Sequence, residues 1–427
     1  MNYGELETAT PLVRPYPGAE RTLDVLSFVL SDVRYGLGAY LAVYLLTEYA
    51  WDAASIGLAL SFGGLVGLAS QTPLGAMVDA LRAKRALLAG AVVVVTATCY
   101  LIPLAPRFWP VAAAGVVGAL AGTTIGPALA AISLGIVGPA GFARRAGRNE
   151  ALFHLGNGAI NVVILAATPF FGMAVVFWMM GVTAVASVVA ALAVPERAIN
   201  HDMARGLLPG DAGRGSRPSP WGTLLASRPL LVFAGCGALF HMSNGAMLGL
   251  VAQKLALEHP GQGIAFTAAC AIAAQSVMVP AAALAGRRAD LWGRKPLLMA
   301  AFVALSLRGA LYTLSDHPAW LIGVQLLDGV GAGLIGALFP VVIADLTRGS
   351  GHFNAAQGAV GTIHAIGGIL SGALAGQIVV LAGYQAAFLT LAGTAALGAA
   401  LFWMAMPETR AYAVPAVPPM ATATGGS

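Results

Sequence analysis

Ionisable residues are scarce inside the long apolar segments of this 427-residue chain, so the few that occur there are the first candidates for chemistry. Asp32 and Arg34 share one segment, and Asp328 lies in another. If these segments cross a bilayer, a charge near the middle costs about 2.5–3.5 kcal/mol and needs a partner or a function. Burial disfavours the charged form of a carboxyl group, so Asp32 could bind and release protons near neutral pH. The alternative for Asp32 is a structural ion pair with a neighbouring helix.

The partners of these charges are left open by the sequence. Asp32 and Arg34 are two residues apart, which on a helix points their side chains about 200° apart, so we expect no direct pair. Asp328 could pair with Arg308 in the preceding segment, and that pair would be structural. It could instead pair with Arg34, far away in the first half of the chain.

Imidazole and amide side chains recur at helical spacing in three further segments. His154, Asn157 and Asn161 fall on one helix face, and the other two sets are His241 with Asn244 and Gln357 with His364. Such polar faces within apolar segments either form hydrogen bonds between helices or contact a solute. The histidines lack the spacing of a metal site, so we expect neither a metal nor a cofactor.

A short polar motif occurs twice, 211 residues apart. The first copy contains Gly75, Asp79, Lys84 and Arg85, and the second contains Gly286, Asp290, Gly293, Arg294 and Lys295. We expect the glycine to permit close helix packing, the aspartate to face the positive N-terminal end of a neighbouring helix or a basic side chain, and the basic pair to lie at the level of the lipid headgroups. Such a cluster could hold two halves of a molecule together on one side and release them when they rock.

Composition identifies the elements that must position these residues. Hydrophobic residues make up 58% of the chain and charged residues 10%, against about 25% charged in an average soluble domain. The apolar runs are long and do not alternate, which predicts an all-α membrane protein rather than a barrel. The twelve predicted spans are residues 23–46, 54–78, 86–105, 109–137, 150–171, 173–194, 229–252, 264–285, 296–314, 318–343, 355–381 and 384–406.

The basic residues predict the orientation of these spans. With the N-terminus inside, nineteen of the 23 Lys and Arg residues fall in cytoplasmic segments, whereas Arg107 and Lys254 fall outside and Arg34 and Arg308 within spans. This distribution explains the basic composition without a nucleic acid partner, and it predicts a multi-pass inner-membrane protein with both termini in the cytoplasm. The predicted organisation is a cytoplasmic tail (1–22), a six-helix bundle (23–195), a cytoplasmic linker (196–228), a second six-helix bundle (229–410) and a disordered tail (411–427).

Span number, parallel repeat, linker and both loop motifs resemble the major facilitator superfamily (MFS). The resemblance implies two pseudo-symmetric six-helix bundles, a substrate cavity between them and alternating access, with the paired motifs as a cytoplasmic gate. Because the first, seventh and tenth helices line the cavity in that family, the resemblance also implies that the polar faces with His154, His241 and His364 contact a small-molecule substrate. It implies no enzymatic activity. Two features depart from the drug–proton antiporters of that family: the fourth span has no arginine, and the fifth has no Gly-Pro-x-x-Gly-Gly run.

The resulting functional prediction is a monomeric secondary active transporter of a small organic solute, coupled to protons or another ion. Efflux of a drug- or siderophore-like compound is the favoured direction. Proton-coupled uptake of an organic anion, with Arg34 as the anion contact, is the alternative within this class. A membrane sensor that binds a solute without moving it is the alternative from another class.

Overall fold

The computed structural model describes residues 17–34, 37, 39–207, 222, 225–259 and 263–410 of the chain. Every regular element in these residues is helical. The α-helices are α1 (Pro17–Val33), α2 (Ala39–Tyr49), α3 (Ala53–Ala80), α4 (Lys84–Leu101), α5 (Phe108–Phe171), α6 (Ala174–Ala193), α8 (Arg228–Asn244), α9 (Met247–Glu258), α10 (Gly263–Trp292), α11 (Arg294–Leu311), α12 (Pro318–Val324), α13 (Leu326–Leu346) and α14 (Phe353–Ala405). Two 3-10 turns, η2 (Glu196–Ala198) and η3 (Met203–Arg205), follow α6.

Glycine divides the two longest helices into pairs of membrane spans. Gly138 in α5 has φ 68° and Gly383 in α14 has φ 82°, values that favour glycine because it has no Cβ. Eight segments of the described chain are long and apolar enough to cross a membrane, and α5 and α14 each supply two crossings. The pair α1–α2 and the more polar α11 complete twelve spans within the described residues.

Two apolar cores organise these spans into two halves. One core is built from α1 to α6, and the other is built mainly from α8 to α14. The second core also includes Leu134, Phe142 and Ala146 of α5, so the halves share apolar packing in that region. Outward-facing apolar residues such as Phe170 and Val380 are 80% and 82% exposed, which hydrocarbon surroundings explain.

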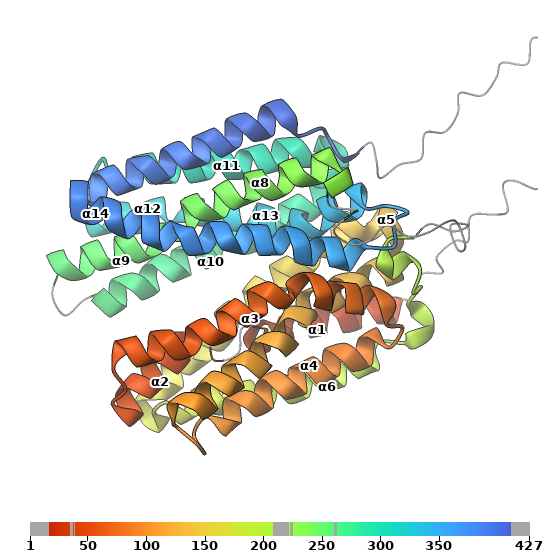
Figure 1. Cartoon of the computed structure of the whole chain (residues 1–427), viewed down its shortest axis with the longest axis horizontal. Coiled ribbons are helices and arrows are strands. Elements are labelled where there is room, and N and C mark those ends of the chain that lie inside the picture. The colour runs from red at the N-terminus through yellow and green to blue at the C-terminus, as the bar shows by residue number, and fades with distance from the viewer. Residues whose placement is uncertain are drawn as a thin grey trace, which may run out of the picture.

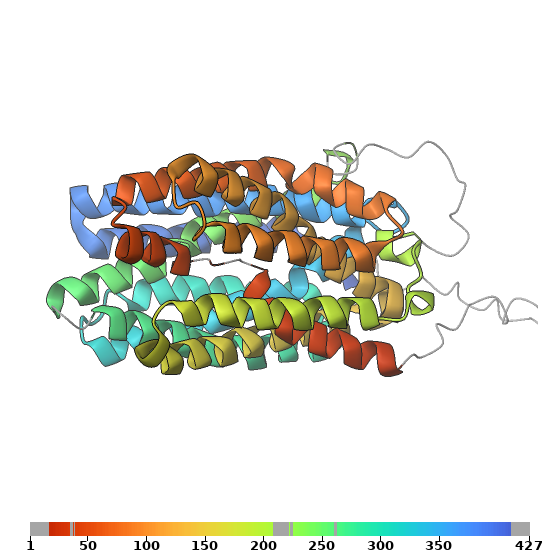
Figure 2. The ribbon, with the colours of Figure 1, turned by 90° about the horizontal axis from the view of Figure 1, so that it is seen from below.

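The halves meet at one end of the molecule, which we call the signature end because it carries Asp79 and Asp290. In Figure 1 the ribbons of the two halves lie close together at the right, where α1 begins and α14 ends, and they diverge toward the left. Figure 2 shows most helices running along the long axis of the molecule. Glycine permits the contact, because a Cβ added to Gly147 of α5 would overlap Gly286 of α10.

The predicted spans are confirmed in number, but several boundaries were wrong. The first helix begins at Pro17 and breaks after Val33, so the polar stretch before residue 23 is partly helical. The fifth span begins at Pro139 rather than at residue 150, because Gly138 turns the chain within one residue and proline is favoured at a helix start. The predicted break at Phe171 is confirmed, whereas the seventh span reaches Glu258. Residues 1–16 and 411–427 of the predicted tails, and most of 208–224 in the predicted linker, lie outside the described residues.

Candidate functional site

A cavity of about 650 Å³ lies between the two halves. Its wall comes mostly from α3, α4 and α5 of the first half, and α13 and α14 of the second half close the other side. Ile369 of α14 lines the cavity and is 61% exposed, so the cavity is not sealed. The wall is largely apolar or glycine, and the polar residues in it are Arg34, Gln71, Thr98, Thr123, Asn149, Glu150 and Gln357.

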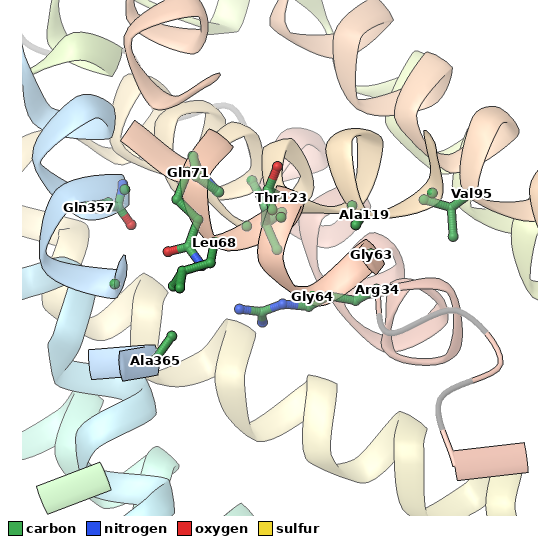
Figure 3. Close-up of a pocket in the computed structure, with 18 of the residues that line it drawn as sticks. Arg34, Gly63, Gly64, Leu68, Gln71, Val95, Ala119, Thr123, Gln357 and Ala365 are labelled. Atoms are coloured by element: carbon green, nitrogen blue, oxygen red, sulfur yellow. The ribbon is translucent and has the colours of Figure 1, made fainter. Parts of the chain in front are cut away.

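Arg34 enters the cavity from the break in the first span. Its backbone N–H bonds to the Leu30 carbonyl at 3.0 Å, and α2 begins only at Ala39. Phe153 of α5 lies under the guanidinium at 5.0 Å, a distance typical of a cation–π contact. Gly126 leaves room for the guanidinium, since a Cβ there would lie 3.4 Å from Nη2. Figure 3 shows the side chain extending into the space of the cavity, which Gln71, Gln357 and Ala365 approach from the other side.

Glu150 is a cavity residue that the sequence analysis did not select. It lines the same cavity as Arg34 and interacts electrostatically with that guanidinium. Its carboxylate lies 3.4 Å from His154 Nε2 and touches Gly336 of α13, where a Cβ would clash with Oε1. The spacing of Glu150 and His154 at i and i+4 could have indicated it, but the predicted loop up to residue 149 placed it at the membrane edge.

His154 links the two halves beside the cavity. Its Nδ1 lies 3.0 Å from the Gln275 side-chain oxygen of α10, and its ring is largely buried. Farther along the same face of α5, Asn161 donates to the Asn157 backbone oxygen at 2.8 Å and accepts a bond of 2.5 Å from the Tyr40 hydroxyl. None of the three predicted residues on this face is part of the cavity wall, although Glu150 one turn earlier is.

Asp32 is not part of the cavity wall, although Arg34 two residues later is. Its carboxylate accepts a hydrogen bond of 2.8 Å from the Thr183 hydroxyl of α6. Arg34 lines the cavity, so the predicted separation of the two side chains around the helix agrees with the structure. A role of Asp32 in proton coupling stays a prediction.

Asp328 and Asn244 belong to a buried network inside the second half. Arg308 of α11 is fully buried and donates to Asp328 at 2.8 Å and to Asn244 at 2.5 Å. Gln325 accepts from the same guanidinium at 3.1 Å, and the Tyr312 hydroxyl donates to Gln325. Of the two partners considered for Asp328, the structure shows Arg308, and none of the network residues lines the cavity.

His241 and His364 lie against each other in the second half. Their ring centroids are 5.1 Å apart, with Phe233 and Phe339 at the edges of the His364 ring. His364 is 6% exposed and packs directly on Gly237, where any Cβ would overlap the imidazole. The sequence predicted both histidines as substrate contacts, but neither is part of the cavity wall, and His364 is buried against Phe339, which lines the cavity.

Gln357 is the other predicted residue that lines the cavity, and it connects the cavity to the signature end. Its amide donates to the Asn354 side-chain oxygen at 3.1 Å. Asn354 in turn donates to Asp79 at 2.7 Å and to the Ala204 carbonyl of η3 at 3.2 Å. A continuous hydrogen-bond chain therefore runs from the cavity wall to the first signature motif.

Asp79 binds the N-terminal end of α14 across the two halves. Its two oxygens accept the backbone N–H groups of Asn354 at 3.1 Å and of Ala355 at 2.9 Å, which lie in the first turn of that helix. A carboxylate in this position satisfies free N–H groups and complements the helix dipole. Gly75 makes the approach possible, because a Cβ there would overlap the Asn354 carbonyl. The expected roles of the glycine and the aspartate are thus seen in the first motif.

The basic pair of the first motif caps helix ends within its own half. Lys84 is 1% exposed and donates to two carbonyl oxygens at the end of α3, both at 2.7 Å. Arg85 donates to carbonyls at the end of α6 at 3.0 and 2.6 Å and pairs with Glu196 at 2.5 Å. Lys84 therefore lies inside the protein at this end of the molecule, because the unpaired carbonyls of α3 bind it there.

The second motif repeats the basic pair but not the bridging aspartate. Arg294 donates to a carbonyl near the end of α10 at 2.9 Å, and Lys295 donates to one at the end of α14 at 2.7 Å. Asp290 pairs with Arg294 at 2.8 Å inside its own half. Gly293, with φ 92°, precedes α11, and Glu408 caps that helix through backbone N–H bonds of 2.9 and 3.0 Å. Close contact between the halves here is made by Gly286.

Metal chemistry has no cluster of residues to support it in the described part of the chain. No group of three or more His, Cys, Asp or Glu side chains lies close enough to hold an ion there. Cys99, Cys236 and Cys270 are free and buried.

Comparison with known proteins agrees with this architecture. The Major Facilitator Superfamily model matches residues 23–276 and 231–421. Two uncharacterized MFS-type transporters, from Mycobacterium tuberculosis strains CDC 1551 and H37Rv, are each 48% identical over 393 residues, which cover 92% of this chain and 94% of the relative.

Solved structures with a similar fold are only distantly related in sequence. FucP in the outward conformation has a TM-score of 0.70 at 14% identity, covering 91% of this chain and 98% of FucP. The proton:xylose symporter XylE has a TM-score of 0.67 at 13% identity, covering 91% and 95%. The human organic anion transporter MFSD10 has a TM-score of 0.66 at 17% identity, covering 91% and 100%. On its fold, its repeated motifs and these matches, the chain belongs to the major facilitator superfamily, a family of membrane transporters and not of enzymes.

Proposed function

We propose that this transporter moves a small, largely apolar organic anion by alternating access, coupled to protons. The observation that carries the proposal is the presence of Arg34 and Glu150 in one mostly apolar cavity between the halves. A guanidinium in a low-dielectric cavity binds a carboxylate or similar anion strongly. The apolar and glycine-rich wall would hold the remainder of such a solute.

Glu150 provides a way to couple the anion to a proton. When ionised, its carboxylate competes with an anionic substrate for Arg34. Protonation removes that competition, so a proton and an anion bind together more favourably than either binds alone. His154, 3.4 Å from the carboxylate and in contact with Gln275 of the other half, would make Glu150 sensitive to the arrangement of the two halves.

The signature end would be the cytoplasmic gate. With that end inside the cell, the structure represents a state closed toward the cytoplasm, with Asp79 on α14 and Gly147 against Gly286. The chain from Gln357 through Asn354 to Asp79 would report substrate in the cavity to the gate. Opening requires the bonds of Asp79 to break and the two glycine contacts to separate.

Efflux of a drug- or siderophore-like compound is the second candidate. The largely apolar wall favours it, since a cavity of about 650 Å³ with few polar groups suits an amphiphilic compound. In that mode Glu150 would bind either a proton or a cationic group of the solute, which gives antiport. The position of Arg34, whose guanidinium extends into the cavity, favours the anion (Figure 3).

Flux measurements in proteoliposomes test the proposal. Purified protein is reconstituted, a pH gradient is imposed, and uptake of a panel of labelled aliphatic and aromatic carboxylates is measured. We expect an inward proton gradient to accelerate wild-type uptake, and Glu150→Gln to transport without dependence on the gradient. Asp32→Asn is the second acidic variant within the membrane, and its gradient dependence tests whether Asp32 takes part in coupling.

The outcomes separate the hypotheses. If Asp32→Asn loses gradient dependence and Glu150→Gln keeps it, coupling runs through Asp32. If protons drive the counterflow of organic cations and carboxylates show no flux, the symport hypothesis is replaced by the efflux hypothesis. A wild-type flux indifferent to the gradient would end the proposal of proton coupling.

A further inference from the structure

A second cavity, of about 450 Å³, lies at the signature end between α1, α5 and α10. It shares no lining residue with the central cavity. Its polar wall consists of Glu20, Arg144, Arg145, Arg148 and Arg287, and its apolar wall consists of Ala151, Leu152, Leu155, Val279 and Ala283.

The charges of this cavity are not balanced. Asp24 is shared by Arg145 at 2.7 Å and Arg148 at 2.5 Å. Arg144 and Arg287 are exposed, and the described residues supply neither with an ion pair or hydrogen bond. The four arginines against Glu20 and Asp24 leave a formal charge of +2 around one cavity.

The cavity is also divided into a charged and an apolar part along the membrane normal. The part of α5 after Gly138 runs from the signature end toward the opposite end of the molecule. Along it, Arg144 and Arg148 come before Leu152 and Leu155. On α10, which runs outward to that end, Val279 and Ala283 precede Arg287. The arginines therefore lie at the end of the spans and the apolar residues one to three turns deeper, where acyl chains lie.

We propose that this cavity binds an acidic phospholipid, with the phosphate on Arg144, Arg148 and Arg287 and an acyl chain along Leu155 and Val279. A basic pocket between transmembrane helices suits an anionic headgroup by charge. A soluble anion would satisfy the arginines but would leave the apolar wall uncovered, which favours the lipid.

The site would connect the lipid to the conformational state. Arg144 and Arg148 belong to the first half and Arg287 to the second, and Gly147 touches Gly286 between them. A headgroup bound to all three arginines holds the halves together at the signature end. An acidic phospholipid therefore stabilises the closed arrangement of this end, because separation of α5 from α10 would divide its ligands.

Lipid binding by the intact protein tests this inference. Native mass spectrometry counts phosphatidylglycerol bound to the purified full-length chain, and the thermal unfolding midpoint is followed as the lipid is titrated, with phosphatidylcholine as the neutral lipid. We expect the double variant Arg144→Gln/Arg287→Gln to weaken phosphatidylglycerol binding by about tenfold and to lose most of the rise in midpoint. Arg197→Gln, which alters an exposed arginine of η2 at the same end, should behave like wild type.

Two further arms identify the ligand. Ala283→Trp fills the apolar part and keeps every arginine, so it should also reduce phosphatidylglycerol binding. Inorganic phosphate and glycerol phosphate at matched concentration should not raise the midpoint. Unchanged lipid binding in both variants, equal binding of phosphatidylcholine, or full stabilisation by phosphate alone would overturn the proposal.

Discussion

The carboxylate of Asp79 in the first half accepts both the backbone N–H of Asn354 in the second half, at 3.1 Å, and its side-chain amide, at 2.7 Å. The equivalent aspartate of the second motif, Asp290, pairs with Arg294 in its own half. One of two related motifs thus carries the polar link between the halves, whereas both contribute close glycine contacts.

Asp79→Asn should open the signature end more readily. The amide keeps one acceptor oxygen but loses the charge that complements the N-terminus of α14, a loss of about 1 kcal/mol or about fivefold in the equilibrium between closed and open states. Spin-label or fluorescence distances across the signature end measure this change. Asp290→Asn is the matched control, and an equal opening in both variants would contradict a special role of Asp79.

Gly75→Ala and Gly147→Ala should hinder closure of the signature end. Each new methyl group overlaps backbone of the other half, at Asn354 or Gly286, so the helices must move apart. We expect increased labelling of cysteines placed at that end and a strongly reduced transport rate. Gly90→Ala in α4 is the control, because a Cβ there meets nothing within 4 Å. Normal transport and labelling in Gly147→Ala would argue against the closed contact as part of the cycle.

Arg34→Gln should impair recognition of the anionic group without unfolding the protein. Loss of a charge-assisted hydrogen bond costs about 1.5–3 kcal/mol, or roughly 10- to 150-fold in substrate affinity. Arg34→Lys should recover part of this affinity, because the charge returns without the fork of donors. Calorimetry compares the binding of a carboxylate with that of its neutral amide. An equal loss of affinity for both ligands would show that Arg34 does not recognise the charge.

Asp328→Asn should destabilise the second half. Arg308 would keep its bonds to Asn244 and Gln325 but would lose its buried counter-ion, and breaking such a pair costs about 3–5 kcal/mol. Thermal unfolding in detergent measures the loss. The double variant Arg308→Met/Asp328→Leu should recover much of it, since no unpaired charge remains. Full stability of the single variant would mean that the ion pair is not structural.

The fold was predictable because a chain that is surrounded by lipid can adopt few alternative folds. Apolar length, the excess of basic residues on one side and two motifs 211 residues apart were enough to predict twelve helices in two halves. The boundary at Pro139 was not predicted, because three arginines after Gly138 indicated a loop. In the structure Arg145 is a buried residue of a helix, where Asp24 and Asn149 bind it.

The site was predictable only in part, since spacing gives the face of a helix but not what that face contacts. Arg34 and Gln357 reach the cavity, whereas His364, Asn244 and Asp328 face helices of their own half. A polar face of a helix can bind a neighbouring helix or line a cavity, and its sequence looks the same in both cases. Glu150 lies against Gly336 of the other half, whereas Asp32 binds Thr183 of its own half, and spacing alone predicts neither neighbour.

The single-residue corner at Gly138 has a practical consequence for topology mapping. Where the fourth and fifth spans meet, no loop exists into which a reporter enzyme, an epitope or a protease site could be inserted without displacing Arg145 from Asp24. After α6, Glu196 and Arg197 of η2 are exposed on the same side of the molecule, whereas Met203 and Ala204 of η3 are buried, so tags intended for that side belong at η2 and not at η3.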